Sequence, residues 1–313
     1  MLYELEIERN KRKSVLLIVT MILFMTVLGY IIGRAAFHKG SYGLYVALFA
    51  LIFTGIWSLI SFYKGDIIVL LMSKAKKVNH NDNPRLFNIV EEMSISSGLP
   101  MPKVFIMEDP APNAFATGRD PAHSAVCVTT GLLNNLNRDE LQGVIGHEMS
   151  HIKNFDIRLS LLLAVFVGAI ALISDYFLRY MFFFGGGRRR KRNSSSKGGG
   201  QAELIILIIT IALAIIAPII GKLIQLSISR KREYLADAGS VELTRNPDGL
   251  ASALEKIASI SSTTKLKATN RATQHLYIIN PLNPFQKHVT NLFSTHPPIN
   301  ERIQKLKAMS HRN

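Results

Sequence analysis

Four long apolar runs interrupt the mixture of polar and hydrophobic positions along the chain. They cover residues 15–32, 41–63, 159–174 and 204–221. The first, second and fourth contain no charged residue, and each is long enough to cross a hydrocarbon layer of about 30 Å as a helix. The third is followed by Asp175 and Arg179, whose i, i+4 spacing lets them pair on one helix face. The pattern predicts a membrane protein with about four hydrophobic helices.

The first run can be interpreted in two ways. The basic segment 9–13 before it would suit the start of a cleavable signal peptide. However, the run is longer than the apolar part of a typical signal peptide, and no Ala-x-Ala-like cleavage site follows it. We therefore expect an uncleaved membrane anchor.

The first long polar stretch contains signals for short helices and strands. Asn83 is placed to cap a helix that has Pro84 in its first turn, and Gly98 is expected to end it. A further helix is expected to open at Arg138 and to run through His147. Runs rich in Val and Thr predict strands at 103–107 and 125–129.

These elements predict a mainly α protein with a small β-sheet. We expect four parts: a basic head and transmembrane hairpin (1–63), the first part of a catalytic domain (64–156), a second hydrophobic hairpin (157–226) and the second part of the catalytic domain (227–313). The second hairpin contains a Gly- and Ser-rich basic linker at 185–200, which composition predicts to be a solvated loop.

The charge of the chain is strongly basic, with 37 Lys and Arg against 22 Asp and Glu and a net charge of +15. Many of these basic residues flank the apolar runs, as expected where side chains meet the anionic headgroups of a lipid bilayer. No interleaving of aromatic and basic residues suggests RNA recognition. The expected surface partner is therefore the membrane, and no nucleic acid is expected.

A single cysteine, Cys127, rules out an internal disulfide and fits a reducing compartment. It stands in Ala-Val-Cys-Val-Thr, which has the alternation of a strand. We expect a small buried apolar side chain there and no nucleophile.

The candidate chemistry lies in His147-Glu148-Met149-Ser150-His151. At i, i+4 on a helix, the two imidazoles lie on one face and can share one zinc ion. Glu148 between them can act as general base on a metal-bound water. A pair of surface histidines is the alternative interpretation of this motif.

A third ligand should come from another element. Glu233 can serve, and Asp237, one helical turn later, can accept a hydrogen bond from the far nitrogen of His147 and fix its tautomer. The alternative is a solvated acidic pair beside the basic residues 230–232.

Several motifs together resemble the HtpX-type membrane metalloproteases, gluzincins that are related to the CAAX prenyl proteases. They lie at residues 147–156, 229–237, 112–118 and 295–298. The resemblance covers nearly the whole chain and implies one zinc ion held by His147, His151 and Glu233, with Glu148 catalytic.

The same resemblance implies that Asn113, Ala114 and Phe115 lie on a strand that borders the substrate cleft. An extended peptide can add to such an edge through backbone hydrogen bonds. His296, in Thr-His-Pro-Pro, is either a donor to the oxyanion of the tetrahedral intermediate or a surface turn residue.

The resemblance further implies a stress-response protease of the bacterial cytoplasmic membrane, with its site facing the cytosol. Expected substrates are misfolded or damaged membrane proteins, and expected partners are other membrane proteases or quality-control proteins. The basic linker departs from the positive-inside rule, so the second hairpin either crosses the bilayer or packs within one leaflet.

Three other functions are consistent with parts of the pattern. A prenyl-protein processing protease would use the same chemistry. A metal-binding membrane transporter would place its ligands near the bilayer midplane, whereas the expected ligands lie outside the apolar runs. An inactive scaffold with a structural zinc would have no need of Glu148.

Overall fold

The computed structural model describes residues 2–36, 41–180, 230–261, 264, 276–278 and 297–310, and within helices the side chains of 2–3, 35–36 and 171–180 are left out. The predicted fourth apolar run, the basic linker 185–200 and His296 lie outside these residues, as do the side chains of Asp175 and Arg179.

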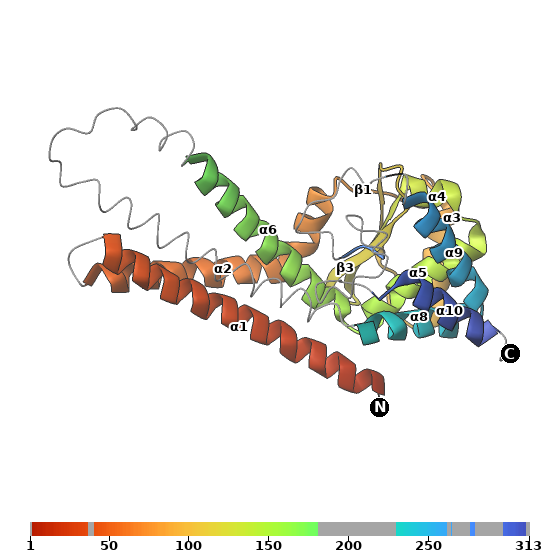
Figure 1. Cartoon of the computed structure of the whole chain (residues 1–313), viewed down its shortest axis with the longest axis horizontal. Helices are drawn as coiled ribbons and strands as arrows, with labels where there is room; N and C mark the ends of the chain where they lie inside the picture. The colour runs from red at the N-terminus through yellow and green to blue at the C-terminus, as the bar shows by residue number, and fades with distance from the viewer. Residues whose placement is uncertain are drawn as a thin grey trace.

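A long helical arm projects from a rounded domain (Figure 1). The arm consists of α1 (Leu2–Ala36) and α2 (Ser41–Met72), with α6 (Asp156–Tyr180) beside them. Within the described residues, two helical segments are long and apolar enough to span a membrane, Glu4–Arg34 and Ser41–Met72. The first two predicted spans are therefore present as helices.

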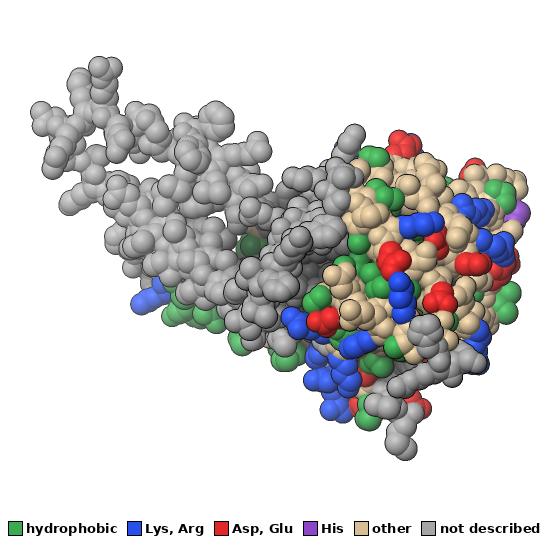
Figure 2. All heavy atoms as spheres, turned by 45° about the vertical axis from the view of Figure 1, so that its right-hand side comes forward, with side chains coloured by type: hydrophobic (Ala, Val, Ile, Leu, Met, Phe, Trp, Pro, Cys, Tyr) green, Lys and Arg blue, Asp and Glu red, His purple; other side chains and the backbone are tan. Residues whose placement is uncertain are grey.

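Large exposed hydrophobic side chains are concentrated on this arm. Among the described residues, all of them lie on α1 or α2 except Ile95. Figure 2 shows green side chains along the arm, whereas the domain surface mixes acidic and basic side chains. An apolar surface of this kind, continuous along two helices, is typical of contact with lipid.

The third apolar run forms most of α6, but its first half is covered by protein. Leu162, Leu163 and Phe166 pack against Leu17 and Met21 of α1. The apolar character of this part of α6 is thus explained by contacts within the protein.

The predicted ends of the helix between Asn83 and Gly98 and the predicted start of the helix at Arg138 are confirmed. The Asn83 side chain accepts a hydrogen bond from the backbone N–H of Leu86 at the start of α3 (Pro84–Ser97), and Gly98 ends that helix in the left-handed region with φ 67°. The active-site helix α5 (Arg138–Lys153) opens on a capping box between Asn137 and Glu140.

A four-stranded sheet lies beside these helices, in the order β1-β2-β4-β3. The strands are β1 (Lys76–Lys77), β2 (Lys103–Met107), β3 (Ala114–Asp120) and β4 (His123–Thr129). The central pair β2–β4 is parallel, and the two outer pairs are antiparallel. The prediction for 103–107 is confirmed, and β4 begins two residues before the predicted 125–129. The other helices of the described residues are α4 (Thr130–Asn135), α8 (Arg230–Thr244), α9 (Pro247–Ser261) and α10 (Ile299–Ser310).

The two faces of the sheet support different parts of the molecule. On one face, Val126 and Val128 of β4 join a core shared with α3, α5 and α9. On the other face Cys127 joins Val69 and Leu70, since successive strand residues point to opposite faces. The α2 helix thus continues nine residues beyond the predicted end of its span at Tyr63 and reaches the sheet. Cys127 is buried, as expected.

The contact between α5 and α9 is too close for a larger residue at Gly143. A Cβ at Gly143 would lie 2.7 Å from the backbone N and 2.9 Å from the Cα of Leu250. We predict that Gly143→Ala destabilises the domain by about 1–3 kcal/mol, because backbone on both sides must move. Thermal unfolding of the purified full-length chain measures this. Gly55→Ala is the matched control, because that Cβ meets no atom of the described residues within 4 Å. Equal melting temperatures for both variants would contradict the packing argument.

Candidate metal centre

The two histidines of α5 point at each other from adjacent turns. An apolar face of Leu141, Ile145 and Met149 fixes α5 in the core, and His147 and His151 lie on the adjoining face. Their Nε2 atoms are 3.2 Å apart, with ring planes at 90°. Two ring nitrogens this close can both be ligands of one cation.

Glu233 of α8 completes the group, as the sequence predicts. Its Oε2 lies 3.9 Å from Nε2 of His147 and its Oε1 lies 3.7 Å from Nε2 of His151. Ligand atoms of the three residues lie within 4.8 Å of one another. A tetrahedral ion with bonds of 2.0–2.1 Å separates its ligands by about 3.3 Å, so the donor set and spacing suit a small divalent metal.

The far nitrogen of each histidine is held by a carboxylate. Nδ1 of His147 lies 3.0 Å from Asp237, and Nδ1 of His151 lies 2.9 Å from Asp156. A donor proton on Nδ1 leaves the Nε2 lone pair directed at the metal position. The Asp237 contact was predicted from its spacing to Glu233.

No local pattern in the sequence indicates the role of Asp156, although the residue lies in the motif 147–156. Its approach depends on the turn between α5 and α6, where Phe155 adopts a φ of 58°. A non-glycine residue rarely takes this left-handed conformation. In a continuous helix, a residue five positions after His151 would point away from its imidazole. Helical spacing therefore gave no signal for the contact with Asp156.

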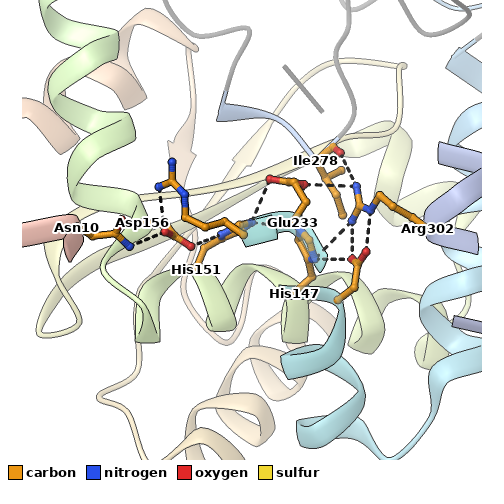
Figure 3. Close-up of polar contacts among 9 residues, drawn as sticks. Asn10, His147, His151, Asp156, Glu233, Ile278 and Arg302 are labelled. Atoms are coloured by element: carbon orange, nitrogen blue, oxygen red, sulfur yellow. Dashed lines mark hydrogen bonds and ion pairs between the residues drawn. The ribbon is translucent and has the colours of Figure 1, made fainter. Parts of the chain in front are cut away.

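Arg302 of α10 is the second residue that the sequence analysis missed. Its side chain is fully buried and binds both carboxylate oxygens of Asp237, at 2.9 and 2.6 Å. The same guanidinium lies 3.5 Å from Oε2 of Glu233 and donates to the carbonyl of Ile278 at 3.2 Å (Figure 3). Arg302 therefore connects the end of the chain to two carboxylates of the centre.

The electrostatics of the site differ between the two histidines. Burial lowers the pKa of His147 to about 4, even though Asp237 acts in the opposite direction. Burial also acts to lower the pKa of His151, but Asp156 and Glu233 raise it to about 9. For Asp237, burial raises the pKa, but Arg302 and His147 outweigh it and lower the pKa to about 2.

Glu148 is buried beside the edge strand of the sheet. Its burial raises the pKa to about 7, against an opposing hydrogen bond from the backbone of Ala116 in β3. The carboxyl group thus lies on the active-site helix and contacts the strand at the same time. A pKa near neutrality suits a group that both accepts and donates a proton.

The edge strand β3 lies beside Glu148 of the centre, and its role at a substrate cleft stays a prediction. Ala114 and Phe115 lie on β3, which is an edge strand, and Asn113 directly precedes it. The Ala114 carbonyl accepts a hydrogen bond of 3.0 Å from Ile278 N–H, and Phe115 packs edge-on against Tyr277. The chain itself therefore occupies the edge at Ala114.

Burial decides between the alternatives that the sequence left open. Glu233, Asp237 and His147 are at most 6% exposed as side chains, so a solvated acidic pair and two surface histidines are both wrong. His151 keeps 17% of its side chain exposed and is the most accessible of the three candidate ligands. His123 is exposed.

The Arg302–Asp237 pair should be essential for stability. We predict that Arg302→Met lowers the free energy of unfolding by about 3–5 kcal/mol, because it leaves the Asp237 carboxylate buried without its cation. Chemical unfolding of the metal-free protein in detergent measures this. Lys307→Met on the same helix is the control, since its ion pair with Glu255 is about half exposed and should contribute under about 1 kcal/mol. Similar losses in the two variants would contradict this account.

Comparisons with known proteins agree with the geometry of the centre. Residues 80–310 match the family described as Peptidase family M48. Proteins named "Protease HtpX homolog" are similar over almost the whole chain. They include those from Thermoanaerobacter pseudethanolicus (46% identity, 99% of this chain and 98% of the relative), Listeria monocytogenes serovar 1/2a (45%, 99% and 100%) and Dictyoglomus turgidum (43%, 98% and 94%).

A crystal structure of S. mikatae Ste24p is also similar, with 18% identity and a TM-score of 0.46. The match covers 95% of this chain and 65% of that protein's chain. The identity to the HtpX homologues and the family match over more than two thirds of the residues establish the relationship. The chain belongs to peptidase family M48 and is a metalloprotease of the HtpX type.

Proposed function

We propose that the chain is a zinc-dependent endopeptidase of the cytoplasmic membrane. The observation that carries this proposal is the meeting of His147, His151 and Glu233 beside Glu148 at the edge of a sheet. Imidazole and carboxylate donors with tetrahedral spacing suit zinc. When bound, zinc would act as a Lewis acid that polarises the scissile carbonyl and lowers the pKa of a bound water towards neutrality.

Glu148 and the two carboxylates Asp237 and Asp156 control the positions of the protons in this mechanism. Glu148 is placed to take a proton from the attacking water and to pass it to the leaving amine. Burial raises the pKa of Glu148 above its usual range, which favours a carboxyl group that can also hold a proton. Asp237 and Asp156 keep the proton of each imidazole on Nδ1, away from the reaction.

The edge strand β3 supports a peptide as the substrate. Backbone groups on an edge strand can pair with an extended chain. The hydrogen bond from Ile278 N–H to the Ala114 carbonyl is of this kind, so the edge already accepts backbone pairing. We propose that a substrate strand pairs along β3 towards Ala116, whose N–H group faces Glu148.

Membrane-protein substrates are proposed from the position of the hairpin. The inner end of α2 packs on the same sheet, through Val69 and Leu70, and the first turns of α1 reach the centre through Asn10. A site this close to the bilayer surface favours loops and ends of damaged membrane proteins. Other membrane proteases or quality-control proteins are the proposed partners.

The general-base role of Glu148 can be tested directly. We predict that Glu148→Gln retains zinc but loses casein cleavage by at least about a hundredfold, because the amide cannot accept the proton of water. Purified full-length protein in detergent is assayed for bound zinc and for cleavage. Glu91→Gln, a change at an exposed position of α3, is the control and should keep full activity. Wild-type activity in Glu148→Gln would refute the mechanism.

The proposed topology places the catalytic domain and the start of α1 in the cytosol. The basic residues at the start of α1, among them Arg9, Lys11 and Arg12, favour that side. The end of α1 at Arg34 then lies on the opposite side. Multiple crossings by 157–226 are part of this proposal and stay a prediction.

Labelling of cysteines tests this topology. We predict that a membrane-impermeant maleimide labels Arg34→Cys from outside intact spheroplasts and labels Glu91→Cys only in inverted vesicles. Both positions are exposed, whereas the native Cys127 is buried and its pKa is raised by burial, so the wild-type chain serves as the unlabelled control. The reverse labelling pattern would place the active site outside.

A further inference from the structure

We propose that Asn10 of α1 is a positioning residue for the metal centre. By holding Asp156 and the end of α5, it makes the orientation of His151 depend on the docking of the first membrane helix. The inference rests on the proposed zinc site and goes beyond it, because it assigns a role in metal affinity to a residue of the membrane hairpin.

Asn10 is a polar side chain with no solvent exposure on a helix that is mostly exposed. Its Nδ2 donates two hydrogen bonds, one of 3.0 Å to the carbonyl of Asn154 and one of 2.8 Å to Oδ1 of Asp156. Asn154 is the C-cap of α5, where backbone carbonyls lack partners within the helix. One amide group thus binds both sides of the junction between α5 and α6.

The carboxylate of Asp156 contacts residues of three other helices, α1, α5 and α8. Its Oδ2 accepts from Nδ1 of His151 at 2.9 Å, while Oδ1 accepts from Asn10 and from Nη1 of Arg232 at 3.1 Å. Figure 3 shows Asn10, Asp156 and His151 in a row that continues to Glu233. The carboxylate is therefore fixed from α1 and α8, and it fixes the imidazole in turn.

A second residue of α1 holds the same junction. The Lys11 ammonium lies 4.5 Å from the ring centroid of Phe155, the residue with positive φ that turns the chain into α6. Beyond it, Ser14, Leu17 and Met21 continue the buried side of α1. Docking of this helix and the position of Asp156 are thus coupled through several adjacent contacts.

A purely structural role would also explain a buried asparagine, since buried amides need partners. The partner of Asn10 is Asp156, which itself contacts His151, and this favours the positioning role. Carboxylates that orient ligand histidines change metal affinity by 10–100-fold when they are altered. Coupling is reciprocal, so a bound metal should also strengthen the docking of α1.

Zinc affinity of the full-length protein tests the proposal. We expect Asn10→Ala to raise the zinc dissociation constant about tenfold, measured by competition with a chromophoric chelator. Ser14→Ala is the control, because Ser14 is buried one turn further and, among the described residues, its hydroxyl donates only to the carbonyl of Asn10. We expect it to bind zinc within about twofold of wild type. Wild-type affinity in Asn10→Ala would overturn the proposal.

Asn10→Asp is a second variant with nearly the same shape, for the case in which the alanine variant folds poorly. It replaces the amide donors by acceptor oxygens next to Asp156, so the dissociation constant at pH 8 should rise at least as much as in Asn10→Ala. An unchanged value would again overturn the proposal.

A double-mutant cycle separates positioning from general stabilisation. If Asn10 acts through Asp156, Asn10→Ala should have little further effect on zinc affinity in the Asp156→Ala background. Fully additive effects would overturn the proposal. In addition, zinc should slow hydrogen exchange of residues 8–14 in the wild type and much less in Asp156→Ala. Failure of the wild type to bind zinc would instead refute the proposed function, and the inference with it.

Discussion

The burial of charged groups around two imidazoles is the constraint on which the rest of the structure depends. An ionised carboxylate inside a protein is costly unless a cation or several donors face it. Asp237 is paired with Arg302, and Asp156 is paired with Arg232 and His151. Because these groups come from α5, α6, α8 and α10, the centre forms only when segments distant in sequence pack together. The ligand geometry is thus a consequence of how the chain neutralises its buried charges.

The small sheet links this centre to the membrane part. One face carries the helical core that fixes α5, and the other carries the inner end of α2 and the first half of α6. Phe115 illustrates the arrangement, because its backbone belongs to the edge strand near Glu148 while its side chain packs among residues of the membrane-side core. A peptide paired with this edge would lie between the catalytic residues and the hairpin.

Local periodicity accounts for what the sequence could predict. Helical spacing placed His147 and His151 on one face, and the same spacing linked Glu233 to Asp237. The caps at Asn83 and Gly98 and the alternation of β4 are equally local signals. By contrast, Asn10 looked like one member of a basic flank, and Arg302 followed no pattern. Their roles depend on contacts across 146 and 65 residues of sequence, which no local signal specifies.

These two missed residues approach the centre from opposite sides. Asn10 supports His151 through Asp156, and Arg302 supports His147 through Asp237. One belongs to α1 and the other to α10, so each candidate histidine ligand depends on a helix that is distant from α5 in sequence. Helix α1, which is long and apolar enough to span a membrane, therefore also contributes contacts to the candidate metal centre. The Asp156 carboxylate links the two parts directly, because one oxygen accepts from Asn10 of α1 and the other contacts His151 of α5.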